Sequence, residues 1–281
     1  MFDQKIEEMI EQVQKPARYT GGEMNTAIKS WPEAEVHFAF CFPDTYEVAM
    51  SHLGMKILYG VINQQPWALC ERVCMPWVDM KALMEKEGVP LFSLETRTPL
   101  NRFDVVGFTL QYEMSYSNIL AMLKLGGIPL HTAERTDADP IVCVGGPCAF
   151  NPEPLADFVD AVMIGDGEEM IVEFIAAVRE WKKSGEPREA CLRRLAKIPG
   201  VYVPSFYEVS YHEDGTIAAF TPKCPEAPAT VRKRLVLDMD KAYYPTEIPV
   251  PYTEIVHDRI MLEIMRGCTR GCRFCEAGVL Y

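Results

Sequence analysis

The sequence predicts an α/β fold built on an open, doubly wound and mostly parallel β-sheet. Short, almost entirely apolar segments alternate with helical segments along residues 34–185. Apolar strands of this kind are typical of parallel strands that helices cover on both faces. Polar and glycine-rich turns follow several of these segments. In doubly wound sheets the carboxyl ends of the strands border the ligand crevice, so these turns fall where a ligand would bind.

The expected elements divide the chain into regions. An amphipathic helix at 2–13 and a loop containing residues 18–23 form an N-terminal region, residues 1–33. In the α/β domain, residues 34–185, we expect strands at 36–42, 69–74, 90–93, 104–110, 141–146 and 161–166, and helices at 52–63, 78–86, 115–125 and 168–183. The polar stretch Ser184–Pro187 marks a change of composition and the end of this domain.

Residues 186–258 have a different character. They begin with a short helix at 188–197 and continue with a β-hairpin over 201–220, whose turn is Asp214-Gly215. A proline-rich linker starts at Pro222 and runs to about Pro251. A last strand, Arg259–Met265, opens the region 259–281.

Composition limits the class of protein and its partners. Hydrophobic residues make up 48% of the 281 residues, which is typical of a globular protein. The net charge of −12 gives no indication of broad attachment to nucleic acid or to an anionic membrane surface. No apolar run reaches the roughly 18 residues of a membrane span, and the first residues are too polar and acidic for a signal peptide. We therefore expect a cytoplasmic protein with no membrane partner.

Three of the ten cysteines form a motif, Cys268, Cys272 and Cys275 in RGCTRGCRFC. Three thiolates can hold three irons of a cubane cluster and leave the fourth iron open, whereas an electron-transfer ferredoxin normally supplies four. An open iron can bind a reactant, as the open position of a catalytic zinc site does. The alternatives are a zinc site and unligated thiols. Zinc would need a fourth ligand, and His257, the nearest histidine upstream, belongs to no recognisable pairing.

The other cysteines give weaker indications. Cys41, Cys143 and Cys148 lie in or beside apolar segments and are predicted to be small buried hydrophobic residues. Cys70 and Cys74 repeat a C-x3-C spacing, but no third cysteine lies nearby, so we do not expect them to bind metal.

The turns at the predicted strand ends form a candidate cofactor-binding rim. Its members are polar or conformationally special residues, namely Thr109, Gly145, Gly146, Pro147, Gly165 and Gly167. The alternative is that they are ordinary loops, because every fold of this class needs turns at these places.

The motif RGCTRGCRFC resembles the cluster motif of radical SAM enzymes, including the aromatic Phe274 before the last cysteine. Upstream, VGGPCAFNPEPLADFVDAVMIGDGEE resembles the GGP loop and the Gly-acidic-Gly-Glu turn of the cobalamin-binding-like domain that often precedes this core. The segments RYTGGEMN, FPDTYEVAMSHLGMKILY and IPGVYVPSFY are similar to one subfamily with this two-part architecture. The resemblance covers essentially the whole chain.

The resemblance implies that Cys268, Cys272 and Cys275 ligate a [4Fe-4S] cluster whose open iron binds S-adenosylmethionine. One-electron reduction, by a partner such as flavodoxin or ferredoxin, would then yield a 5′-deoxyadenosyl radical that abstracts hydrogen from a substrate that the sequence does not name. The resemblance also implies cobalamin as a candidate cofactor at the rim, and methyl transfer as the reaction where cobalamin binds.

Two further segments resemble known contacts to S-adenosylmethionine and to cobalt. Gly21-Gly22-Glu23 spells the family's GGE motif, which contacts the methionine amino group, but it precedes the cysteines by about 245 residues, so we expect a turn. His52 invites assignment as a cobalt ligand. It lies too far beyond Asp44, within a predicted helix, and Tyr46 stands where the D-x-H pattern needs histidine. We therefore do not expect His52 to bind cobalt.

Residues 259–281 correspond in this resemblance to the start of a radical SAM β/α barrel. One β/α unit takes roughly 30 residues, and only six residues follow Cys275. We therefore expect a barrel truncated after its first strand and no turnover by this chain alone. The alternatives are a cobalamin- or nucleotide-binding module without catalytic activity and an iron–sulfur electron carrier, which the missing fourth cysteine disfavours.

Overall fold

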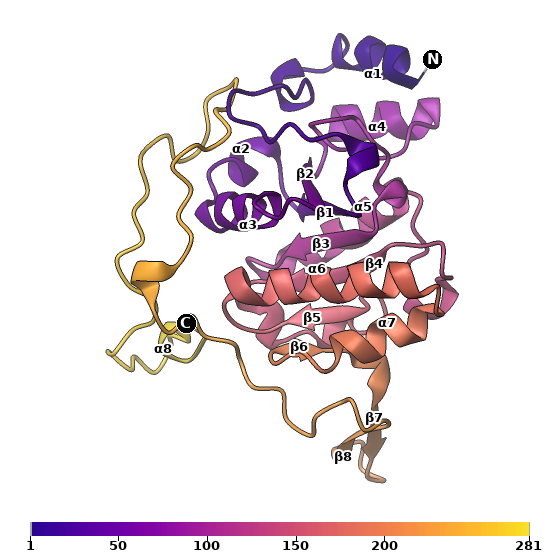
Figure 1. Ribbon diagram of the computed structural model, residues 1–281, viewed down its shortest axis with the longest axis vertical. Helices are drawn as coiled ribbons and strands as arrows, with labels where there is room; N and C mark the ends of the chain where they lie inside the picture. The colour runs from indigo at the N-terminus through magenta and orange to yellow at the C-terminus, as the bar shows by residue number, and fades with distance from the viewer. Residues whose placement is uncertain (1, 281) are drawn as a thin grey trace.

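A six-stranded sheet forms the centre of the computed structural model, which describes residues 2–280 (Figure 1). The strand order is β2-β1-β3-β4-β5-β6; β1 to β5 are parallel, and β6 pairs antiparallel at the edge. The strands are β1 (Val36–Phe42), β2 (Ala68–Cys74), β3 (Val105–Thr109), β4 (Ile141–Gly145), β5 (Ala161–Met163) and β6 (Val201–Tyr202). The predicted open, mostly parallel α/β sheet is confirmed.

Helices cover both faces of this sheet. On one face α3 (Leu53–Asn63) and α6 (Gly167–Ser184) pack against each other, in front of the sheet in Figure 1. Right-handed crossovers place α4 (Val78–Glu87) and α5 (Tyr116–Leu125) on the opposite face. The remaining α-helices are α1 (Phe2–Ile10), α2 (Tyr46–Ala49), α7 (Arg188–Leu195) and α8 (Ala277–Leu280). Because α6 is buried at Met170, Phe174, Val178 and Trp181, every third or fourth residue, it presents one apolar stripe to the core.

Two predicted strands are wrong. Within residues 90–93, Phe92 makes only an isolated antiparallel bridge to Pro99. Residues 259–265 have no strand conformation and no ladder partner among residues 2–280. Both segments have the apolar composition of strands, but a strand also needs a neighbouring backbone to receive its hydrogen bonds.

The predicted hairpin is present in a shorter form. β7 (Tyr207–Tyr211) and β8 (Ile217–Pro222) pair antiparallel around Asp214-Gly215 and project away from the central sheet (Figure 1). Val201 and Tyr202, expected in the hairpin, instead pair with β5 as strand β6. The sheet and its covering helices therefore extend through residue 202, beyond the change of composition at 185. Within residues 2–280, no helix combines the length and the apolar character that crossing a membrane requires.

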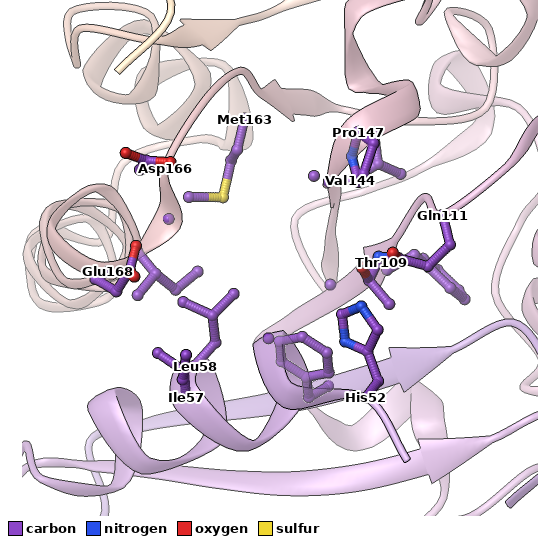
Figure 2. Close-up of a pocket in the computed structure, with 18 of the residues that line it drawn as sticks. His52, Ile57, Leu58, Thr109, Gln111, Val144, Pro147, Met163, Asp166 and Glu168 are labelled. Carbon is purple, nitrogen blue, oxygen red and sulfur yellow. Dashed lines mark hydrogen bonds between the residues drawn. The ribbon is translucent and has the colours of Figure 1, made fainter. Parts of the chain in front are cut away.

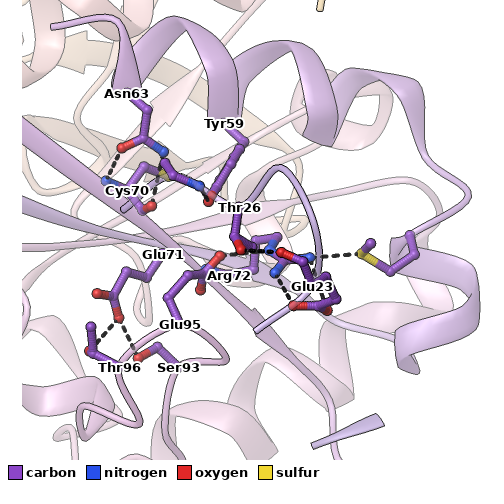
Figure 3. A network of polar contacts seen from close by, with 12 residues as sticks. Glu23, Thr26, Tyr59, Asn63, Cys70, Glu71, Arg72, Ser93, Glu95 and Thr96 are labelled. Carbon is purple, nitrogen blue, oxygen red and sulfur yellow. Dashed lines mark hydrogen bonds and ion pairs between the residues drawn. The ribbon is translucent and has the colours of Figure 1, made fainter. Parts of the chain in front are cut away.

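A buried ion network joins the N-terminal loop to the sheet (Figure 3). Arg72 on β2 donates through Nη2 to Glu23 Oε2 at 2.8 Å and through Nε to Glu95 Oε1 at 2.7 Å. The Tyr46 hydroxyl donates to Glu23 Oε1 at 2.9 Å. Both oxygens of Glu23 are therefore engaged inside the domain. Residues 21–23 form a loop without the predicted turn, and Glu23 fixes this loop to the domain.

The linker after the hairpin returns to this same N-terminal loop. Val250 N donates to Met24 O at 3.0 Å, and Asn25 Nδ2 donates to Ile248 O at 3.2 Å. The two segments lie side by side along the edge of the molecule (Figure 1). The linker thereby leads the chain past α3 towards the cysteine motif.

Candidate functional site

A cavity of about 320 Å³ opens at the carboxyl ends of β1, β3, β4 and β5, beside the first residues of α3 and α6 (Figure 2). This is the edge of the sheet where ligands bind in doubly wound folds. All six residues of the predicted rim line it: Thr109, Gly145, Gly146, Pro147, Gly165 and Gly167. Turns that lie far apart in the sequence therefore contribute to one site.

The floor of this cavity is apolar. Phe38 and Phe40 of β1 face it together with Met163 of β5. Gly107 on β3 leaves space for the ring of Phe38, because a Cβ at position 107 would lie 2.3 Å from Phe38 Cζ. A ligand that enters the cavity must therefore bring an apolar part.

The turn after β5 is held in place by the linker. Gly165 has a φ of 105°, in the region that favours glycine, and a Cβ there would lie 2.1 Å from Arg234 O. Arg234 N donates to Ile164 O and Asp166 N donates to Arg234 O, both at 2.9 Å. The Gly-acidic-Gly-Glu turn therefore has a fixed backbone on one side of the cavity.

His52 lines the cavity and caps a helix. It is the residue before α3, not part of the helix interior, and its Nδ1 accepts a hydrogen bond from Met55 N at 3.1 Å. Burial lowers the pKa of His52, so the ring is neutral near pH 7. Since Nδ1 accepts, the single ring hydrogen is on Nε2. In this tautomer the Nε2–H group has no lone pair to offer a metal.

Thr109 and Gln111 add two uncharged polar side chains to the side of the cavity that His52 lines. Gln111 Nε2 donates to Thr109 Oγ1 at 2.5 Å, and both residues line the cavity next to His52 (Figure 2). Together the three side chains offer a ligand hydrogen-bonding groups that carry no charge at neutral pH.

The opposite side of the cavity is acidic. Asp166 comes directly before α6, and Glu168 is in its first turn. The same side of the cavity is also lined by Glu263 and Arg266, from the segment before the cysteines. Arg266 Nη1 lies 3.2 Å from Asp166 Oδ1, its Nε donates to Glu263 Oε1 at 2.8 Å, and its Nη2 pairs with Glu168. The hydrogen bonds that Arg266 donates to Glu263 and Glu168 raise its pKa. Three carboxylates thus surround one permanently charged guanidinium.

The three predicted cluster cysteines lie together on one loop. Cys268, Cys272 and Cys275 are all exposed. Arg270 N lies 3.5 Å from Cys268 Sγ, and Cys275 N donates to Cys272 O at 3.0 Å. Among residues 2–280, no three His, Cys, Asp or Glu side chains are gathered closely enough to hold a metal ion.

The donor set of this loop nevertheless suits a cluster with three protein ligands. Its three thiols fall within eight residues on an exposed segment, so they are accessible to incoming iron. In sites of this kind the metal itself draws its ligands together, so separate thiols in the metal-free chain are compatible with ligation. Cys70 and Cys74 both lie on β2, where Cys70 is buried and Cys74 is partly buried.

Sequence reasoning missed several residues of the cavity. The Gly-acidic-Gly-Glu turn carried a signal for Asp166 and Glu168, but no sequence pattern connects Glu168 with Arg266, which is 98 residues further along the chain. The capping position of His52 likewise depends on where α3 begins, which helical periodicity does not fix to one residue.

Comparisons with known proteins agree with the sequence motifs. Residues 54–204 match the family described as "Radical SAM proteins, N-terminal". The uncharacterized protein MJ0966 of Methanocaldococcus jannaschii is 28% identical over 195 residues, which are 69% of this chain and 34% of the relative. The chain therefore spans about a third of the length of this relative.

Two solved structures show a remote likeness to this chain. The radical S-adenosylmethionine methyltransferase TsrM of Kitasatospora setae, with tryptophan substrate and a SAM analogue bound, gives a TM-score of 0.36 at 16% identity, over 64% of this chain and 29% of that one. The cobalamin-dependent S-adenosylmethionine radical enzyme OxsB, with aqua-cobalamin and S-adenosylmethionine bound, gives 0.34 at 13% identity, over 69% and 24%.

Proposed function

This chain belongs to the family of radical SAM proteins, matching their N-terminal region, and we propose that it supplies a radical SAM enzyme with a cluster loop and an adjoining cofactor pocket. One observation carries the proposal. Arg266, two residues before Cys268, lines the same cavity as all six residues of the predicted rim. This supports a proposed cluster loop that adjoins the proposed pocket.

Cys268, Cys272 and Cys275 are the proposed ligands of a [4Fe-4S] cluster. When bound, this cluster with S-adenosylmethionine at its open iron would supply a 5′-deoxyadenosyl radical on one-electron reduction. The chain's own contribution is to hold the three thiolate ligands and to place positive charge beside them. Arg270 and Arg273, between the cysteines, supply that charge.

Cobalamin is the proposed occupant of the pocket, in preference to a nucleotide. In nucleotide sites the phosphate lies at a helix N-terminus, but the start of α6 carries Asp166 and Glu168, whose charges repel phosphate. The apolar floor and the neutral side chains of His52, Thr109 and Gln111 fit an uncharged, amide-bearing part of cobalamin instead. Cobalamin is larger than the cavity, so only one part of it would enter. Methyl transfer to a substrate is the reaction that we propose with cobalamin bound.

Anaerobic reconstitution tests the cluster. We expect about four iron atoms per chain and an EPR spectrum of the reduced cluster that changes when S-adenosylmethionine is added, because binding alters the open iron. C268A, C272A and C275A should each lose the iron, whereas C224A, outside the motif, should keep it. A spectrum that S-adenosylmethionine leaves unchanged would reject the open site.

Binding of hydroxocobalamin tests the pocket separately. The chain should retain it through gel filtration, with its visible absorption, and should not retain ATP. G145V places methyl groups towards the cavity and should reduce retention; G145A is the control, because a Cβ there meets Met163 only at an ordinary 3.5 Å. Retention of ATP without hydroxocobalamin would favour the nucleotide module.

A further inference from the structure

An ion-pair cluster joins the segment before the cysteine motif to the α/β domain. Arg266 pairs with Glu168 and with Asp166, the latter at 3.2 Å, across the mouth of the cavity. Within its own segment Arg266 Nε donates to Glu263 Oε1 at 2.8 Å. We call these four residues, Asp166, Glu168, Glu263 and Arg266, the Arg266 clamp.

Partial burial makes the clamp stronger than an ordinary surface ion pair. The side chain of Arg266 is 17% exposed and that of Glu168 is 10% exposed. Charges that are shielded from water interact more strongly than exposed ones, and charge-assisted hydrogen bonds add to the attraction. Without the guanidinium, three carboxylates would face one another across the mouth, so the clamp depends on the positive charge at position 266.

Arg266 makes the hydrogen bonds and ion pairs that are described between residues 259–280 and the α/β domain. Lys233 Nζ donates to Val279 O at 2.7 Å, and the Tyr244 hydroxyl donates to Met261 O, but both donors belong to the linker. Residues 259–267 also belong to no helix or strand. Just upstream, His257 N donates to Ser51 Oγ at 3.0 Å. Between that contact and Cys268, Arg266 is the residue whose described hydrogen bonds and ion pairs reach the α/β domain.

We propose that Arg266 is a positioning residue: through Glu168 and Asp166 it holds the start of the cysteine motif at the mouth of the cavity and so couples the pocket to the cluster loop. Arg266 is two residues before the first cysteine and is itself part of the cavity wall. A ligand that fills the cavity contacts the same side chain that positions the loop. The coupling to a ligand rests on the proposed function, whereas the clamp itself can be tested without any ligand.

Limited proteolysis by trypsin measures the clamp directly. Trypsin must take an arginine side chain into its own pocket, so an arginine held in ion pairs is cleaved slowly. Arg270, in the same loop, has no ion pair among the described residues and provides an internal reference. In single-cut digests quantified by mass spectrometry, E168Q should raise the ratio of cleavage after Arg266 to cleavage after Arg270 by about fivefold. Glu168 suits this test because its described side-chain partner is Arg266 alone.

E169Q is the matched control. Glu169 lies next to Glu168 in the first turn of α6, but it pairs with Arg234 at 3.0 Å and not with Arg266. E169Q should leave the cleavage ratio unchanged, and E168D, which keeps the charge, should stay much closer to the wild type than E168Q does. An unchanged ratio in E168Q, or an equal rise in E169Q, would overturn the proposal. Melting temperatures of all three variants show whether general unfolding contributes.

Hydroxocobalamin tests the coupling. When bound, it should lower cleavage after Arg266 relative to Arg270 in the wild-type chain and should have a smaller effect in E168Q. Binding without any protection of Arg266 would overturn the coupling. If visible absorption shows that hydroxocobalamin does not bind, the proposed cofactor is wrong, and the ligand-free digests still decide whether the clamp exists.

Discussion

Arg72 and Arg266 each lie among carboxylates, but they hold together different kinds of structure. Arg72 and the two carboxylates that it pairs with, those of Glu23 and Glu95, have side chains no more than 6% exposed. Arg266 is 17% exposed and lines a cavity, where it pairs the segment before the cysteines with the first turn of α6. The first arginine is inside the folded domain, and the second is at its border.

This difference sets how each network can move. Separating Arg72 from its partners would leave charges without water inside the domain, which is costly enough that the network opens only when the domain unfolds. The Arg266 clamp is closer to solvent, so water can replace its partners at a smaller cost. A fully buried network is therefore suited to stability, whereas a partly exposed one is suited to a contact that responds to a ligand.

The largest expected effect comes from breaking the buried network. R72Q leaves Glu23 and Glu95 unpaired in the interior and should lower the free energy of unfolding by about 3–5 kcal/mol. E168Q, at the clamp, should lower it by less than about 1 kcal/mol. Urea-induced unfolding of both variants at neutral pH measures the two losses. Equal losses would remove the distinction between the two arginines.

A neutral version of the network shows whether stranded charge is the cause. In R72M/E23Q/E95Q none of these three positions carries a charge, so this variant should recover part of the stability lost in R72Q, even though more side chains have changed. If it is no more stable than R72Q, the loss comes from packing around Arg72 and not from unpaired carboxylates.

The parts of the molecule that the sequence predicts well are those set by local patterns. The strands β1, β3 and β4 are short apolar runs that end in polar or glycine-rich turns, so both the sheet and the rim at Thr109 and Gly145 follow from neighbouring residues. Residues 259–265 have the same apolar pattern, but whether they form a strand depends on a partner backbone elsewhere.

Neither the Arg266 clamp nor the capping role of His52 can be predicted from neighbouring residues in the sequence. Arg266 and Glu168 are 98 residues apart, and the fold alone brings them together. Capping of α3 by His52 requires the helix to begin at Leu53, one residue later than its apolar periodicity indicates. Side-chain partners of this kind depend on the positions of whole elements, which periodicity does not supply.

His52 gives the pocket wall a pH response that neither arginine has. Burial lowers its pKa in the folded chain, so below pH ~6.5 the unfolded chain binds more protons than the folded one, and stability falls as the pH is lowered. H52N keeps a capping side chain without a titrating ring. Between pH 7 and 5 the wild type should therefore lose stability more steeply than H52N, by at most about 1.4 kcal/mol per pH unit.

Urea-induced unfolding at pH 7, 6 and 5 measures this difference in slope. The control is H212N, because His212 is exposed on the hairpin. Identical slopes for the wild type and H52N would mean that burial does not keep the ring of His52 neutral, and His52 would then not be a neutral Nε2–H donor in the cavity.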